Sequence, residues 1–213
     1  MAKYQLFASP TSPFVHKVLI AAVELGLQDQ IGYSSQIVNV FSSPNDTVCS
    51  TNPLGKIPAL ILPSGSPIFG SSVIVQYLDS VSSKNILPAY DDPKRYDSLT
   101  FEALGDGILE AALLIRYELT GRDFSKQNEV WITAQHGKIE RGLKHLMKVT
   151  LPPPDTPAPL PIEGISVASV LWYLEGRFPT LAWWEWPGGF ELKGWYEKVK
   201  GREGWLKYDF PKN

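Results

Sequence analysis

The spacing of apolar and polar residues differs between the first and second parts of the chain. Up to residue 82, short apolar runs are separated by turn residues. Four strands are predicted there, over residues 3–8, 33–41, 57–62 and 68–69. Two helices are predicted over residues 14–26 and from Gly70 to about residue 81, and polar residues 42–51 are expected to form a loop, with at most a short helical turn. This order of strands and helices predicts an α/β domain.

Beyond residue 91 the pattern is helical, with apolar residues at every third or fourth position and no convincing strand. Four helices are predicted, over residues 91–120, 125–149, 165–178 and 190–200. The proline-rich residues 151–161 exclude helix and strand, so they predict a stiff surface loop. The expected fold class is therefore α/β plus all-α. Its boundaries are residues 1–82 for the first domain, 83–91 for a linker and 92–213 for an all-helical domain.

Composition narrows the class of protein. With 44% hydrophobic residues, 20% charged residues and a net charge of −2, the chain has the balance of a soluble globular protein, and neither nucleic acid nor a membrane is expected as a partner. The single cysteine, Cys49, excludes an internal disulfide and favours a reducing, cytoplasmic location. We expect Cys49 to be an ordinary small side chain. Without a Cys-x-x-Cys or a metal-spaced His/Cys cluster, no metal site is expected.

The segment Asn52–Leu60 is the most informative stretch of the chain. It begins as a turn and ends as a strand, with Pro58 at the mouth of that strand. If the Ile57–Pro58 bond is cis, the N–H and C=O groups of Ile57 are free to pair with an extended guest peptide. The alternative is a plain turn before a strand, because only about 5–6% of X–Pro bonds in folded proteins are cis.

A second candidate feature lies at the start of the helix predicted for residues 14–26. Ser12 can cap this helix, with Pro13 at the first helical position. A hydroxyl in this place can also donate a hydrogen bond to a bound thiolate, because the helix dipole favours negative charge there. Ser9 is a second candidate for this role, and the alternative is that Ser12 is a cap and nothing more. No Ser–His–Asp pattern is visible, although His16 lies one turn further on.

Both stretches resemble the cytosolic glutathione S-transferase family. Asn52–Leu60 resembles the segment that carries the cis-proline in that family. Ser12-Pro13-Phe14, with Lys17 three residues later, resembles the serine version of its thiol-activating motif. The resemblance implies a thioredoxin-like first domain, a helical second domain and a homodimer. It also implies that glutathione, as co-substrate, is activated for attack on an apolar electrophile.

The resemblance assigns roles to particular residues. It makes Ser12 the catalytic residue. The expected glutathione-binding residues are Phe14, Lys56, Ile57, Pro58, Ser71 and Ser72. The expected electrophile pocket is formed by Phe14, Arg116, Tyr117 and Trp184. For Lys56 the alternative is a solvated surface lysine, and for the tryptophans at 183, 184 and 186 it is a hydrophobic plug between helices.

Two positions depart from the family pattern. Gly70 stands where the family usually has an acid that holds the γ-glutamyl end of glutathione. Loss of a hydrogen bond to a charged group costs about 1.5–3 kcal/mol, so affinity is expected to fall by roughly one to two orders of magnitude. We expect compensation by a carboxylate on the partner subunit's first C-terminal helix, where the candidates are Asp97, Glu102 and Asp106. Ser169 replaces the usual acid of a capping box in which Ser166 is the expected cap.

Three other functions remain open at this point. A thiol reductase of the same family uses cysteine at position 12, so serine argues against it. A glutathione-dependent isomerase or lyase uses the same site and agrees equally well with the sequence. A non-catalytic glutathione-binding or interaction module gains some support from Gly70.

Overall fold

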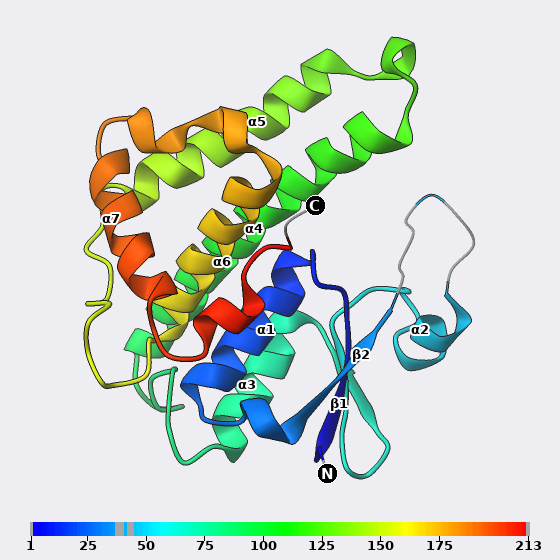
Figure 1. The fold of residues 1–213 in the computed structure, drawn as a ribbon, viewed down its shortest axis with the longest axis vertical. Coiled ribbons are helices and arrows are strands. Elements are labelled where there is room, and N and C mark those ends of the chain that lie inside the picture. Colours follow the sequence, from blue (N-terminus) through cyan, green and yellow to red (C-terminus); the bar gives the residue numbers. More distant parts are fainter. Residues whose placement is uncertain (1, 37–40, 42–44, 212–213) are drawn as a thin grey trace.

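The computed structural model describes residues 2–36, 41 and 45–211 (Figure 1). Its first part is a mixed four-stranded sheet with helices. The elements are β1 (Tyr4–Ala8), α1 (Pro13–Glu24), β2 (Ile31–Ser35), α2 (Asp46–Thr51), β3 (Ala59–Ile61), β4 (Pro67–Phe69) and α3 (Ser71–Val81). The strand order is β2-β1-β3-β4, with β2 parallel to β1 and both β3 and β4 in antiparallel pairings. This is the predicted thioredoxin-like arrangement.

The second part is helical. It consists of α4 (Lys94–Gly121), α5 (Glu129–Leu146), α6 (Ile162–Arg177) and α7 (Gly189–Lys200). Short 3-10 helices lie at Gln28–Gln30, Phe124–Lys126, Pro179–Leu181, Trp183–Glu185 and Trp205–Tyr208. Helix α4 packs against α5 and α6, and α6 packs in turn against α1 (Figure 1). Among the described helices, none combines the length and apolar character needed to cross a bilayer.

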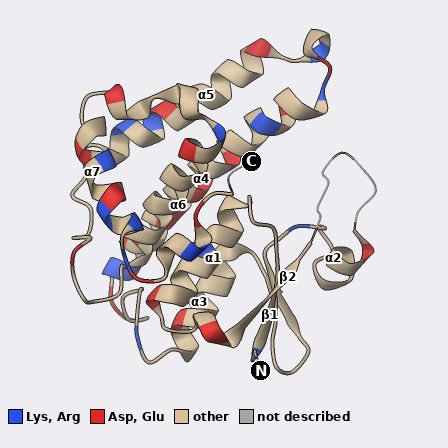
Figure 2. Ribbon diagram, viewed as in Figure 1, with Lys and Arg blue, Asp and Glu red and all other residues tan. Residues whose placement is uncertain are grey.

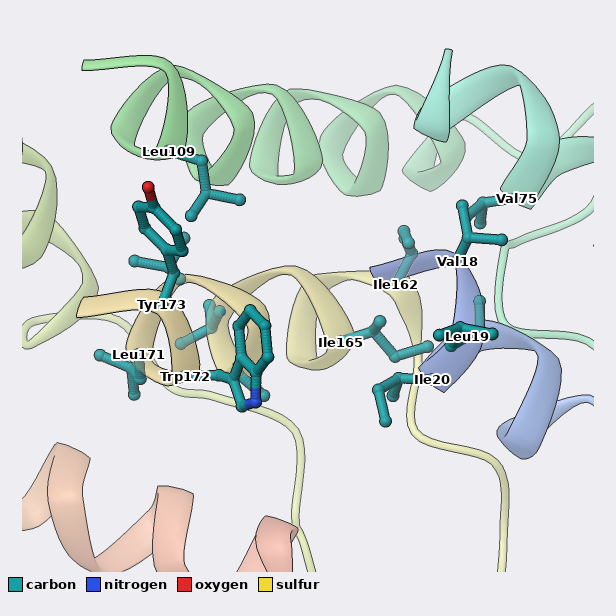
Figure 3. Packing of buried hydrophobic residues seen from close by; sticks show 14 of the residues in the cluster. Val18, Leu19, Ile20, Val75, Leu109, Ile162, Ile165, Leu171, Trp172 and Tyr173 are labelled. Atoms are coloured by element: carbon teal, nitrogen blue, oxygen red, sulfur yellow. The ribbon is translucent and has the colours of Figure 1, made fainter. Parts of the chain in front are cut away.

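One hydrophobic core runs through both parts. Figure 3 shows Val18 and Leu19 of α1 close to Ile162 and Ile165 of α6, with Val75 of α3 on the other side. All five side chains are buried. Because α1 is covered by the sheet on one side and α6 on the other, nearly all of its residues are buried, including the charged ones.

Charged residues are distributed unevenly between the two parts. Figure 2 shows most Lys, Arg, Asp and Glu residues on the helices and the loops that connect them, whereas β1 and β2 carry almost none. The outer faces of the helices in the second part are exposed to solvent, and charged side chains occupy these faces.

Several predicted boundaries need correction. The strand predicted for 33–41 is β2 at Ile31–Ser35; residues 37–40 of the prediction lie outside the described residues, and Phe41 is in a turn. The strand predicted for 57–62 is shorter, because Pro58 cannot donate a ladder hydrogen bond. Residues 46–51 form the helix α2, capped by the Asn45 side chain.

The capping box predicted at Ser166 is wrong. Helix α6 begins one turn earlier, after Pro161, so Ser166 lies inside the helix and is buried. Its hydroxyl lies against α4, where a Cβ atom on Gly105 would be 2.2 Å from the Ser166 Oγ. Glycine at position 105 therefore allows α4 and α6 to approach closely at this point.

A buried ion cluster joins α1 to α4. Lys17 Nζ lies 2.8 Å from Glu102 Oε1 and 2.7 Å from Asp106 Oδ1. The side chains of Lys17, Glu102 and Asp106 are 0%, 2% and 20% exposed. Charged groups removed from water need such partners, so the cluster fixes α4 relative to the sheet region.

A second buried cluster fastens the C-terminal segment and the proline-rich loop. The Glu24 carboxylate accepts hydrogen bonds from the Arg202 guanidinium at 2.6 and 2.7 Å, from Trp205 Nε1 at 2.7 Å and from the Leu160 N–H at 2.7 Å. Arg202 also donates to three carbonyl groups of the proline-rich loop, those of Pro154, Thr156 and Ala158.

Candidate functional site

The sheet register brings three separate segments to one edge of the sheet. Phe7 pairs with Ala59 in the β1–β3 ladder, and Ala59 pairs with Phe69 in the β3–β4 ladder. The loop after β1, the residues before β3 and the start of α3 therefore lie close together. These three segments carry the residues that the sequence singled out.

The segment before β3 offers unpaired backbone groups. The Ile57–Pro58 bond is cis, as predicted. Neither the N–H nor the C=O of Ile57 has a hydrogen-bond partner within the described part of the chain. The Asn52 side chain holds the preceding turn, donating to the Lys56 carbonyl at 2.8 Å and accepting from the Leu54 N–H at 3.0 Å. The turn is thus fixed internally while Ile57 keeps its donor and acceptor for another chain.

Ser12 caps α1, as predicted. Its Oγ accepts a hydrogen bond from the Val15 N–H at 3.4 Å, and Pro13 follows at the first helical position. The cap uses Ser12 as an acceptor only, and a hydroxyl has a donor as well. The hydroxyl proton therefore remains available to a group bound at the end of the helix. The side chain is half-buried at this end.

The start of α3 has no side-chain cap. Gly70 occupies the cap position with φ 87° and ψ 121°, and Ser71 is the first helical residue. The free N–H groups of the first turn are suited to a carboxylate. Ser72, in contrast, uses its hydroxyl inside the protein, donating to Asp106 at 3.0 Å and accepting from Lys17 at 3.3 Å. The Ser72 hydroxyl thus already has one donor and one acceptor within the chain, and its role in glutathione binding stays a prediction.

The carboxylates expected to replace the missing acid at Gly70 differ in their surroundings. Glu102 and Asp106 pair with Lys17 of their own chain, and Glu102 is buried. Asp97, in the first turn of α4, is exposed. Two of the three candidate carboxylates are therefore already paired within the chain, and they share the single Lys17 cation.

The residues expected in the electrophile pocket do not all lie together. Phe14 is half-buried at the start of α1, and Arg116 and Tyr117 are half-buried near the end of α4. The ring of Tyr117 meets that of Phe41 edge to face at 6.0 Å. Lys56 is exposed beside the Ile57 segment.

Trp184 belongs elsewhere in the fold. It meets Trp183 edge to face at 5.8 Å, and Lys193 Nζ lies 4.6 Å from its ring centroid. Segment 183–186 lies near α5 and α7 in Figure 1, away from the start of α1. Trp183 is fully buried. The structure thus supports a plug between helices, and Trp184 was wrongly placed in the pocket.

His16 is buried and uncharged. Its Nδ1 lies 3.0 Å from Ser169 Oγ, and its ring stacks on Trp172 at 4.1 Å. Burial lowers the pKa of His16 to about 3. An imidazole in this state cannot take up a proton at neutral pH, so His16 has a packing role beneath the site and does not act as a base.

A cavity of about 350 Å³ lies beside the loop that follows β1. Its walls include Ser9 and Pro10 of that loop, Tyr33 of β2, Trp172 of α6 and Tyr208 of the C-terminal segment. The cavity is largely apolar and close to the start of α1, so it offers room for an apolar group.

Two residues near the site were not singled out from the sequence. Tyr173 and Arg177 lie one turn apart on α6, and both come close enough to Arg116 for its charge to affect their pKa values. The signal in the sequence was a tyrosine and an arginine near the end of a mostly apolar helix.

Comparison with known proteins agrees with this arrangement. Residues 11–81 match the protein-family model described as glutathione S-transferase, N-terminal domain. The chain is 32% identical over 187 residues to the uncharacterised GST-like protein YibF of Escherichia coli K12, an alignment that covers 84% of this chain and 86% of that protein.

Solved structures show the same fold. A glutathione transferase family member from Pseudomonas fluorescens Pf-5, crystallised with bound glutathione, is 35% identical, with a TM-score of 0.90 over 98% of this chain and 100% of that one. A structure from the same organism with bound S-(propanoic acid)-glutathione is 34% identical, with a TM-score of 0.86 over 98% of this chain and 100% of that one.

Proposed function

Because the chain belongs to the glutathione S-transferase family, we propose that it binds glutathione at this edge of the sheet and activates its thiol for attack on an electrophile. The observation that carries the proposal is that three groups with free hydrogen-bonding capacity lie close together. These are the hydroxyl proton of Ser12, the unpaired backbone of Ile57 and the uncapped start of α3. Bound glutathione in the relative that is 35% identical supports it.

Each part of the tripeptide has a matching group. The backbone of Ile57 pairs with the cysteinyl residue, as an added strand pairs with a sheet edge. Ser71 and the first N–H groups of α3 hold the γ-glutamyl carboxylate. The exposed Lys56 reaches the glycyl carboxylate, while Phe14 and Pro58 line the walls on either side of the sulfur.

Ser12 acts on the sulfur. It donates a hydrogen bond to the thiolate, and the positive end of the α1 dipole adds to the stabilisation. Each unit by which the thiol pKa falls corresponds to about 1.4 kcal/mol, and a charge-assisted hydrogen bond together with the dipole supplies one to two units. The thiolate then forms the new S–C bond as the leaving group departs with its electron pair.

The electrophile lies on the helical side of the sulfur. Phe14, Arg116 and Tyr117 bound this side, together with the apolar cavity beside Ser9 and Pro10. The S-substituted glutathione bound in a relative that is 34% identical supports a pocket next to the sulfur. A homodimer, a cytoplasmic location and a role in detoxification belong to the same proposal, through the family resemblance.

Calorimetric titration with glutathione, followed by a conjugation assay with 1-chloro-2,4-dinitrobenzene, tests this function. We expect binding, turnover, and a loss of about 10–100-fold in kcat/KM for Ser12→Ala, because the bound thiol is then less ionised. Ser9→Ala is the matched control and should retain activity. Binding without turnover would favour the isomerase or lyase, and absence of binding would favour the non-catalytic module.

A further inference from the structure

Two arginines from different helices lie near each other. Arg116 is on α4 and Arg177 is the last residue of α6, and these two helices pack against each other. Neither guanidinium forms a salt bridge within the part of the chain that the structure describes. Burial lowers the pKa of Arg177, and the positive charge of Arg116 lowers it further. The two charges therefore repel each other in a partly desolvated place.

Tyr173 adds a buried donor to this pair. It lies one turn before Arg177 on α6 and is 1% exposed. Figure 3 shows its hydroxyl directed toward α4, beside Leu109. Within the described residues, neither the Tyr173 hydroxyl nor the Arg177 Nε has a hydrogen-bond partner. Buried polar groups are nearly always paired, so two orphans in one place indicate a missing acceptor.

Tyr173 is a neutral donor under ordinary conditions. Burial raises the pKa of Tyr173 to about 12. The phenol thus keeps its proton at neutral pH and can donate a hydrogen bond to an anion. We refer to Arg116, Tyr117, Tyr173 and Arg177 as the arginine–tyrosine cluster.

The acids nearest in sequence to the two arginines are paired with other residues. Glu118, two residues after Arg116, pairs with Arg122 at 2.8 Å. Glu175, two residues before Arg177, pairs with Lys200 at 3.3 Å. No carboxylate of the described residues thus forms a salt bridge to either arginine of the cluster.

A series of ring contacts connects the cluster to the start of α1. The Arg177 guanidinium lies over the ring of Phe210 at 4.9 Å, and Phe210 packs on Trp172 at 4.7 Å. Trp172 stacks on His16, whose backbone N–H donates to the Ser12 carbonyl at 3.0 Å. The cluster thus belongs to the helical wall that faces the start of α1.

We propose that the arginine–tyrosine cluster binds a carboxylate carried by the electrophile. The inference rests on the proposed function and gives its substrate class, an electrophile with a carboxylate attached to its apolar body. Guanidinium groups match the planar geometry of a carboxylate and donate charge-assisted hydrogen bonds to it. The carboxylate supplies an acceptor for the Tyr173 hydroxyl and for the two guanidinium groups.

Binding of two S-substituted glutathiones tests the inference without turnover. S-(2-carboxyethyl)glutathione carries the anion, and S-propylglutathione is its neutral counterpart. By calorimetric titration, the full-length protein should bind the carboxyethyl compound about 10–100-fold more tightly. Arg116→Gln and Arg177→Gln should each remove most of this preference, while the affinity of the Arg177→Gln variant for the propyl compound changes by less than about twofold.

Further variants separate charge from folding. Arg177→Lys should retain part of the preference, since it keeps the charge. Tyr173→Phe should weaken it by a smaller factor, and Lys126→Gln, which removes an exposed, paired lysine beyond the end of α4, should leave it unchanged. In the conjugation assay, Arg177→Gln should lose activity toward 4-chloro-3-nitrobenzoate and keep it toward the methyl ester of that acid.

The outcomes distinguish this inference from the proposed function. Equal binding of the two conjugates, or a preference that survives both Arg→Gln substitutions, overturns the inference and leaves the proposed function standing. Binding of glutathione without either conjugate also overturns it. If glutathione itself does not bind, the proposed function fails, and the inference fails with it.

Discussion

Lys17 Nζ and Asp106 Oδ1 lie 2.7 Å apart, so one residue of the first helix is joined to one on the longest helix of the second part. Glu102, one turn before Asp106, contributes a second carboxylate at 2.8 Å. The Ser72 hydroxyl completes the cluster from α3. Three helices are thus held together beneath the proposed glutathione site.

Replacing Lys17 should destabilise the folded protein. Lys17→Met leaves two carboxylates without their cation, and breaking a buried ion pair in this way costs about 3–5 kcal/mol. Urea unfolding should show this loss in the free energy of unfolding. Lys126→Met, which breaks an exposed pair with Asp123, should cost less than about 1 kcal/mol. Equal effects of the two substitutions would contradict a structural role for the buried cluster.

Gly70 gives a second prediction, in which two effects oppose each other. Gly70→Asp supplies a carboxylate for the amino group of glutathione, which should tighten binding by about 10–100-fold. Its φ of 87° and ψ of 121° disfavour any L residue, so the unfolding free energy should fall by about 1–3 kcal/mol. Glutathione titration and urea unfolding measure the two terms.

Gly70→Ala is the matched control for that substitution. It carries the same backbone cost and no carboxylate, and among the described residues a Cβ atom at this position would meet Val73 alone, at 3.8 Å. If the aspartate variant binds glutathione no more tightly than the alanine variant, the γ-glutamyl end does not lie at the start of α3.

His16 should make stability depend on pH. Burial lowers the pKa of His16 in the folded protein from 6.5 to about 3. Between these values the unfolded chain takes up a proton that the folded chain does not, so the free energy of unfolding falls as the pH falls. The slope is about 1–2 kcal/mol per pH unit. Urea unfolding between pH 7 and about pH 4 measures it.

His16→Asn is the comparison for this slope. Its amide can occupy the place of the imidazole Nδ1 beside Ser169, and it does not titrate. Stability of the variant should therefore change less steeply over the same pH range. Parallel curves for the two proteins would show that His16 is not the group responsible.

Arg202 should stabilise both Glu24 and the proline-rich loop. Arg202→Met leaves the Glu24 carboxylate, which is 5% exposed, without its cation, and should cost about 3–5 kcal/mol. It also frees the carbonyl groups at 154, 156 and 158, so limited proteolysis should cut residues 151–161 faster.

Lys198→Met provides the control for Arg202. Its pair with Asp155 also joins α7 to the proline-rich loop, but the two side chains are 60% and 63% exposed. Solvent screens such pairs, so the loss should be below about 1 kcal/mol. If this variant is cut as fast as Arg202→Met, any side-chain contact to the loop protects it from proteolysis, and the role of Arg202 is not specific.

The sequence by itself determined those features that depend on near neighbours in the chain. The cap at Ser12, the turn before Pro58 and the helical second part follow from capping, proline chemistry and apolar spacing, and all three are present. The order of the elements, together with the Asn52–Leu60 segment, was enough to indicate the thioredoxin-like sheet.

The tertiary structure decided which distant side chains meet. Lys17 and Glu102 are 85 residues apart, and helical spacing does not tell which helix covers a given face. The sequence likewise did not show the partners of the Ser72 hydroxyl, the packing of Trp184 between helices, or the approach of Tyr173 and Arg177 to Arg116. Their partners depend on how α4 and α6 pack against α1, because a side chain's surroundings arise from long-range packing and not from its own stretch of sequence.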